Sequence, residues 1–110
     1  MKITPEIARG AYEFLHTIPP FNGWNLPDGE DIKFKIIKSH MTSGEYRHYG
    51  GDDHEIAVYK DMMPPALLGV VAHEMIHLHQ RMTKTDGGGA HNRSFKILAS
   101  KITKILGVDV

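Results

Sequence analysis

The chain has 110 residues, enough for one domain spanning residues 1–110 with a core that needs no disulfide. Its 13 basic and 13 acidic residues give a formal net charge of zero, so no overall field would draw it to nucleic acid or to a membrane. It has no cysteine, which excludes disulfides, thiolate metal sites and cysteine nucleophiles.

The first predicted element is a helix near the N-terminus. Thr4-Pro5-Glu6 is typical of a helix start, since threonine caps, proline tolerates the first turn and glutamate suits the positive end of the helix dipole. Residues 1–6 lack the apolar stretch of a signal peptide, and no apolar run approaches the about 18 residues that cross a membrane, so we expect a cytoplasmic monomer without membrane contact. The helix should end before Pro19-Pro20 and pack one face inward. That face consists of Ile7, Ala11, Phe14, Leu15 and Ile18.

Three strands are expected next, after a loop over residues 21–31 whose Trp24 should cover the core. Residues 32–36 alternate apolar and basic side chains, and residues 45–49 and 55–60 are strand-like segments bounded by glycine-containing turns. Because the connections between them are short, we expect a small sheet that is largely antiparallel.

The next segment, residues 70–78, contains His-Glu-x-x-His within an otherwise apolar run. On a helix His73 and His77 lie one turn apart, so both imidazoles can bind one metal ion. Glu74 projects about 100° away from His73, near enough to take a proton from a metal-bound water without being a ligand. Zinc fits best, because imidazole nitrogen binds it and three protein ligands leave a position for water. The motif therefore predicts a buried helix that carries a zinc hydrolase site.

The motif helix should begin at Pro64-Pro65, where proline is tolerated in the first turn. Gly69 lies inside this helix, one turn before His73, and costs about 1 kcal/mol relative to alanine there. We therefore expect Gly69 to permit a close approach by another backbone, either a strand or the first helix.

The last segment is predicted to be an amphipathic helix that ends near Gly107. Its apolar stripe is formed by Phe95, Leu98, Ala99, Ile102, Ile105 and Leu106. His91 lies four residues before Phe95, so extending the stripe backwards by one turn points His91 inward. This makes His91 the leading candidate for a third metal ligand.

The position of a third ligand in this chain can be compared with its position in known classes of zinc protease. No glutamate follows Glu74, which excludes the gluzincin plan, and Gln80 and Thr83 occupy the positions where metzincins need glycine and histidine. Asp86 and His79 remain as alternatives to His91. His79 is only two residues after His77, which turns it to the far side of the helix.

The order His-Glu-Met-Ile-His, a variable stretch, Gly-Gly-Ala-His-Asn-Arg-Ser-Phe and a lysine-bearing helix resembles the SprT-like or Spartan-type zinc metalloprotease domain. The resemblance covers roughly residues 32–110. It implies an α+β, zincin-like fold with a small three-stranded sheet packed on an N-terminal helix, the motif helix and a C-terminal helix. It also implies a zinc metalloendopeptidase in which His73, His77 and His91 hold Zn²⁺ and Glu74 is the general base.

The expected partner is a protein or peptide substrate, which could add to an edge of the sheet as an extra strand. A group that steadies the oxyanion is also expected, and the candidates are Tyr46, His48, Tyr49, His54 and Arg93. One rival is a repressor-cleaving protease similar to the ImmA family, with Asp86 as an acidic third ligand. Another is a non-catalytic module that binds zinc or contacts nucleic acid weakly through its lysines.

Overall fold

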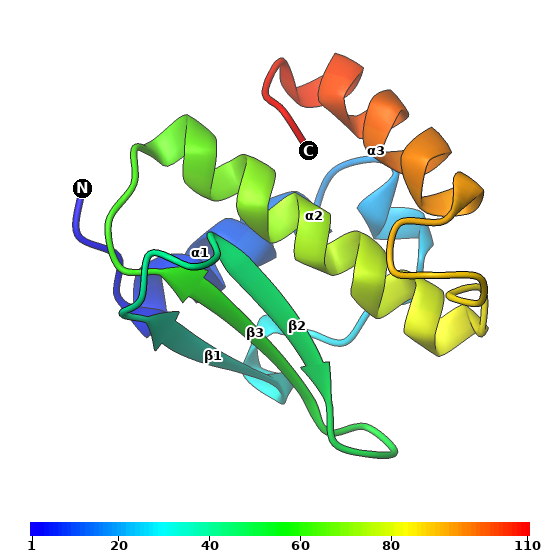
Figure 1. The fold of residues 1–110 in the computed structure, drawn as a ribbon, viewed down its shortest axis with the longest axis horizontal. Helices are drawn as coiled ribbons and strands as arrows, with labels where there is room; N and C mark the ends of the chain where they lie inside the picture. Colours follow the sequence, from blue (N-terminus) through cyan, green and yellow to red (C-terminus); the bar gives the residue numbers. More distant parts are fainter.

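Three helices and a three-stranded mixed sheet form the α+β fold of the protein, which a computed structural model describes over residues 1–110 (Figure 1). Two short 3₁₀ turns, at Phe21–Gly23 and Gly29–Asp31, precede the sheet. The helices and strands in chain order are α1 (Pro5–His16), β1 (Ile32–Ile37), β2 (Gly44–His48), β3 (His54–Tyr59), α2 (Pro64–Thr83) and α3 (Arg93–Leu106). None of these helices is both long and apolar enough to span a membrane.

β3 is the central strand of the sheet, with β1 and β2 at the two edges. It pairs with β2 antiparallel and with β1 parallel. The expectation of a largely antiparallel sheet is therefore right for the β2–β3 hairpin and wrong for β1, because residues 38–43 carry the chain past the place that β3 fills. Residues 54–58 are all buried, and the centre of a sheet is where a strand is covered most completely.

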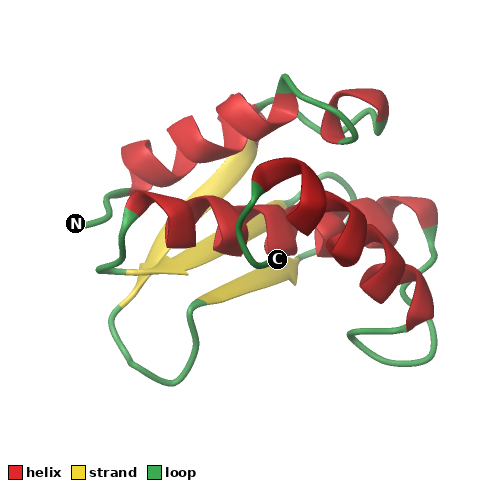
Figure 2. Ribbon diagram, turned by 90° about the horizontal axis from the view of Figure 1, so that it is seen from above, coloured by secondary structure: helices red, strands yellow, loops and turns green.

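One face of the sheet carries the hydrophobic core, and α1 and α2 pack against it (Figure 2). Phe34 of β1 and Ile56 of β3 are register partners and lie in the same buried cluster as Met75 of α2. α3 packs on α2 and adds Phe95 and Ile102 to this core. The α+β arrangement expected from the sequence is thus confirmed, with α2 in contact with both other helices and with the sheet.

The opposite face of the sheet is covered by ion pairs and by no helix. Glu55 is only 1% exposed there, beneath the Lys35 ammonium and the Arg47 guanidinium, each 3.4 Å from one of its carboxylate oxygens. The Tyr49 hydroxyl donates to the same carboxylate at 3.3 Å. The basic residues that alternate along β1 therefore lie on the wet face, as their spacing predicts.

The buried side of α1 differs from the predicted one. Its buried residues are Ala8, Tyr12 and Leu15, whereas Ile7 and Phe14 are 37% and 53% exposed. Tyr12 rotates the buried face because its ring enters the core while its hydroxyl donates to the carbonyl oxygen of Pro27 at 2.5 Å. A buried tyrosine whose hydroxyl has a partner behaves as a large apolar residue.

Two further expectations about core residues can be compared with the structure. Trp24 covers the core as predicted, with its ring 4.0 Å from that of His79. On α3 the predicted stripe holds for Phe95 and Ile102, which are buried, but Ile105 is 51% exposed. The stripe therefore packs against α2 more tightly at its N-terminal end than at its C-terminal end.

Gly69 permits a close backbone approach as expected, but the segment that approaches is the C-terminal tail, residues 107–110, and neither a strand nor α1. A β-carbon on Gly69 would lie 2.2 Å from the carbonyl oxygen of Asp109. The tail is also held by the N–H of Val110, which donates to the hydroxyl of Thr103 on α3 at 3.1 Å. The absence of a side chain at position 69 thus lets the tail lie directly on α2.

Gly69→Ala should displace the tail, because its added methyl group overlaps the Asp109 carbonyl. We expect a loss of about 1–3 kcal/mol in the free energy of unfolding, measured by urea denaturation. Gly10→Ala is the matched control: it lies in the exposed part of α1 with no atom within 4 Å of the added carbon. It should stabilise the protein by about 0.5–1 kcal/mol. Equal stability of the two variants would show that the tail does not rest on α2.

Candidate metal centre

α2 presents the two motif histidines on one face and buries most of its remaining surface. His73 and His77 are half-buried, and their ring centroids lie 5.0 Å apart, as expected for residues one helical turn apart. Glu74 and Met75 turn into the protein and are 5% and 0% exposed. The helix therefore places two imidazoles at its surface and one carboxylate beside them in a largely dry position.

His91 reaches the same place from the loop before α3. Its Nε2 atom lies 3.1 Å from Nε2 of His73, and one ring nitrogen from each of His73, His77 and His91 lies within 4.8 Å of the other two. The ring of Phe95 lies beneath all three, with centroid distances of 4.8, 4.6 and 4.7 Å. The structure thus brings together the three histidines that the sequence singled out.

Asn92 holds the loop in the position that presents His91. Its side-chain oxygen caps α3 by accepting the N–H of Phe95 at 2.9 Å, and it also accepts a hydrogen bond from Gln80 of α2 at 3.1 Å. Its amide nitrogen donates to two carbonyl oxygens, each at 2.8 Å, in residues 85–90, the glycine-rich loop between α2 and α3. The sequence analysis missed this role, although asparagine directly before a helix is a common capping signal.

The C-terminal tail orients His73. The Nδ1 atom of His73 lies 2.7 Å from the main-chain oxygen of Val110, which can only accept, so Nδ1 carries the proton and donates. The lone pair of His73 is then on Nε2, which faces His91. A backbone carbonyl that fixes the free nitrogen of an imidazole is the usual outer partner of a metal-binding histidine. No pattern in the sequence pointed to Val110.

The charge state of the cluster suits a metal ion. Burial, followed by repulsion from His73 and His91, lowers the pKa of His77 to about 4. Burial also lowers the pKa of His73, although its hydrogen bond to Val110 opposes the shift. Neutral imidazole is the form that binds metal, and two nitrogens on a tetrahedral zinc ion stand about 3.3 Å apart, close to the observed 3.1 Å. The three residues therefore fit a metal ion such as zinc.

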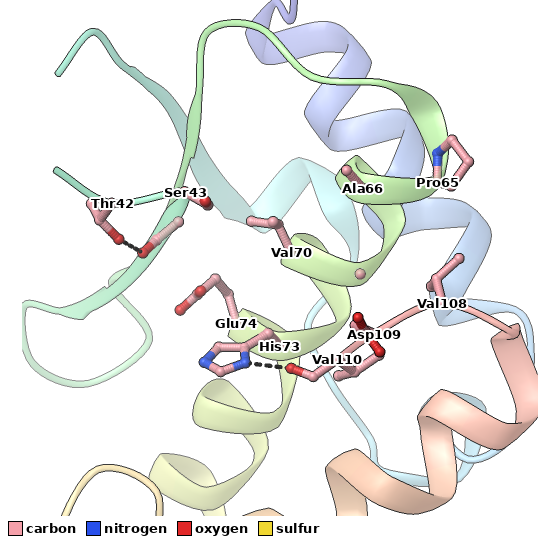
Figure 3. Close-up of a pocket in the computed structure, with 12 residues that line it drawn as sticks. Thr42, Ser43, Pro65, Ala66, Val70, His73, Glu74, Val108, Asp109 and Val110 are labelled. Atoms are coloured by element: carbon pink, nitrogen blue, oxygen red, sulfur yellow. Dashed lines mark hydrogen bonds between the residues drawn. The ribbon is translucent and has the colours of Figure 1, made fainter. Parts of the chain in front are cut away.

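Glu74 lies beside the cluster and is not part of it. Burial, and then the negative charge of Glu45, raises the pKa of Glu74 to about 8. Gly44 of β2 lies against it: a β-carbon there would be 2.9 Å from a Glu74 carboxylate oxygen and 2.5 Å from Val70. The carboxylate points into the space between β2 and α2 (Figure 3). Its position leaves it free to exchange a proton with a group bound in that space.

A cleft runs along α2, and its first part lies between β2 on one side and the tail on the other (Figure 3). It has two parts, of about 550 and 480 Å³, which share Thr42, Gly44, His73 and Glu74. We call the first part the apolar hollow, which is also lined by Ser43, Pro65, Ala66, Gly69, Val70, Val108, Asp109 and Val110. We call the second part the polar hollow, which is also lined by Glu45, Tyr46, His77, Arg81, Asp86, Ala90 and His91.

The alternative ligands lie outside the cluster. Asp86 lines the polar hollow, but its carboxylate pairs with Arg81 at 3.2 Å. His79 lies on the far side of α2, stacked on Trp24. Among the five candidates for steadying an oxyanion, Tyr46 alone lines the cleft, where its hydroxyl is 2.7 Å from Nδ1 of the buried His54.

Comparison with known proteins supports a family relationship. The model of the SprT-like family matches residues 25–110 of this chain. The match includes the motif helix, the glycine-rich loop, α3 and all three strands. No curated protein matches the chain.

The position of His91 in the cluster predicts unequal effects of two neighbouring substitutions on metal binding. His91→Ala removes one of three converging nitrogens and should lower zinc affinity by about 100-fold or more, whereas Asp86→Ala should change it little. Competition with a chromogenic chelator measures both. The reverse order of effects would refute the assignment of the third ligand.

Burial of Glu74 predicts a pH-dependent loss of stability in the metal-free protein. Its pKa is raised in the folded state, so its contribution to stability is complete below about pH 4.5 and is lost as the pH rises through about 8. Glu74→Gln, which cannot ionise, should therefore gain about 2–4 kcal/mol over the wild type between pH 5 and pH 8. Chemical denaturation in the presence of a chelator measures the difference. The histidines titrate in both proteins, so identical pH profiles would contradict the burial of the carboxylate.

Proposed function

The chain belongs to the SprT-like family, and from this membership we propose that it is a zinc-dependent metallopeptidase that hydrolyses peptide bonds. The observation that carries the proposal is the convergence of His73, His77 and His91 beside Glu74, a buried carboxylate that stays outside the group. Three nitrogen ligands with an adjacent free carboxylate are one of the ligand sets with which a hydrolytic zinc site can work.

In the proposed site, His73, His77 and His91 hold the zinc ion, and Glu74 moves protons. Zinc bound by three imidazoles supplies Lewis acidity and lowers the pKa of water in its open coordination position. A Glu74 carboxylate oxygen would accept the proton of the attacking water and later deliver it to the leaving amine. The carbonyl of Val110 keeps the His73 lone pair directed at the centre throughout.

The edge of β2 provides a place for an extended peptide. Ser43 and Tyr49 are joined to β3 by backbone hydrogen bonds of 2.8 and 2.9 Å, and in an antiparallel pair every second residue bonds to the same partner. The alternate residues Gly44, Tyr46 and His48 therefore direct their backbone N–H and C=O groups outward. A substrate strand that pairs there would lie over Glu74, which is in contact with Gly44.

The shape of the cleft favours internal cleavage of a polypeptide. The two hollows continue on either side of Glu74, so a bound chain could extend in both directions from the cleaved bond. Tyr46 is the candidate that lines the cleft, and its hydroxyl, now 2.7 Å from Nδ1 of His54, would have to turn from that partner to donate a hydrogen bond to the oxyanion. This supports an endopeptidase.

We also propose a binding partner: nucleic acid that contacts the outer side of α3. The outer side of α3 carries four basic residues, no acidic residue lies on this helix, and none of the basic side chains forms an ion pair. These residues are Arg93, Lys96, Lys101 and Lys104. Phosphate groups could bind there, with an affinity that falls steeply with salt.

A repressor-cleaving enzyme with Asp86 as a ligand is supported by no contact in the structure.

Glu74→Gln tests the proposed mechanism. The amide cannot take a proton from water, so hydrolysis of an unfolded protein such as casein should fall by about 100-fold to 10,000-fold. The zinc content should stay at that of the wild type, because Glu74 is not among the clustered ligand atoms. Activity and bound metal would be measured on the same preparation. Hydrolysis that survives the substitution would remove Glu74 from the mechanism.

A further inference from the structure

The two halves of the cleft differ in chemistry. Apart from the shared residues, the polar hollow is lined by charged and hydrogen-bonding side chains such as Glu45, Arg81 and Asp86. Among its eight unshared residues the apolar hollow has Asp109 as the one charged side chain and Ser43 as the one hydroxyl, and five of the eight are aliphatic. These aliphatic residues are Pro65, Ala66, Val70, Val108 and Val110.

We propose that the apolar hollow receives the side chain of the substrate residue that follows the cleaved bond and selects an uncharged aliphatic side chain there. This inference rests on the proposed function and names a substrate preference for the same site. It makes Ala66 and Val70 residues that determine specificity.

The position of the hollow supports this role. Val70 precedes Glu74 by four residues on α2, so the hollow begins one helical turn from the proposed general base. Neighbouring residues of an extended peptide are about 3.3 Å apart, so a residue next to the cleaved bond can place its side chain in the hollow. Val70 points toward β2 across this space (Figure 3).

The chemistry of the wall determines which side chain is accepted. Val70, Val108 and Val110 are half-buried and would lose further contact with water when an aliphatic group enters. An amide would lose water without gaining a partner from these valines and would depend on the hydroxyl of Ser43, because that of Thr42 donates to the carbonyl oxygen of Gly44. A carboxylate would in addition meet Asp109, an acidic residue that lines the same space.

The direction of β2 decides which side of the bond the hollow serves. β2 runs from Gly44, which is shared by both hollows, to Tyr46, which lines the polar hollow alone. An antiparallel substrate strand, the more stable and more common pairing, would run the opposite way. Its residues after the cleaved bond would then lie over the apolar hollow.

The wall of the hollow is held firmly enough to discriminate. Asp109 rests on Gly69, Val110 is bonded to Thr103 of α3, and its carbonyl accepts the hydrogen bond of His73. The tail that forms one side of the hollow is therefore the same segment that orients a proposed zinc ligand. A fixed wall of this kind can reject a poorly matched side chain, whereas a mobile wall would adapt to it.

Three peptide hydroxamates test the proposal. They differ only in the side chain next to the chelating group, which is that of leucine, asparagine or aspartate, three groups of similar size. The hydroxamate binds the metal and so fixes the position of the peptide in the cleft. Calorimetry on the zinc-loaded protein should give a dissociation constant about tenfold or more lower for the leucine compound than for the asparagine compound. The aspartate compound should bind weakest.

Two matched variants assign the preference to the hollow. Ala66→Asp places a carboxylate in the apolar hollow at an exposed position in the first turn of α2, where an acidic residue is well tolerated. It should reduce the ratio between the leucine and asparagine compounds to near one. Ser100→Asp adds the same carboxylate at an exposed position on α3 outside the cleft and should leave that ratio as in the wild type.

Equal binding of the leucine and asparagine compounds to the wild type would overturn the proposal. A ratio that Ala66→Asp leaves unchanged would do the same, and failure of all three compounds to bind zinc-loaded protein would overturn it together with the metal site. If the protein shows the expected ratios but hydrolyses no peptide, the proposed selectivity of the apolar hollow would stand and the proposed peptidase activity would be rejected.

Discussion

Burial of α2 is the constraint on which the rest of the site depends. The helix packs against the sheet, α1 and α3, so Glu74 is almost fully buried and the two histidines are half-buried, and a charge on any of them is stabilised less well by water than it would be on an open surface. The histidines respond by remaining neutral, since the pKa of His77 falls to about 4. A neutral imidazole has a lone pair free to bind a cation, so these half-buried histidines are already in the protonation state that metal binding requires. The placement of the two motif histidines beside Glu74 therefore follows from how the motif helix is packed.

The remaining elements turn this constraint into a defined geometry. Asn92 joins the cap of α3 to Gln80 and to the glycine-rich loop, and so fixes the approach of His91. The tail reaches α2 because Gly69 has no side chain, and it supplies the carbonyl that orients His73. These hydrogen bonds come from segments distant in sequence. They fix the orientation of the histidine rings, which proximity of the three residues alone would not do.

Features set by local periodicity could be predicted from the sequence, and features set by long-range packing could not. The spacing of His73 and His77 and the solvent-facing side of β1 follow from helix and strand geometry. His91 was expected on a backward extension of α3, but it reaches the other two histidines from the loop before that helix. The parallel pairing of β1 and the docking of the tail on Gly69 depend on which segments meet in space. The burial of Tyr12 was missed because its hydroxyl finds a partner outside its own helix.

X-ray absorption at the zinc edge tests the central claim most directly, because it counts the ligands of the bound ion without relying on activity. The account predicts one zinc per chain with three imidazole nitrogens and one oxygen at about 2.0–2.1 Å. Spectra that show only two imidazoles, or a ligand set completed by a protein carboxylate, would contradict the convergence of His73, His77 and His91 on a single metal ion.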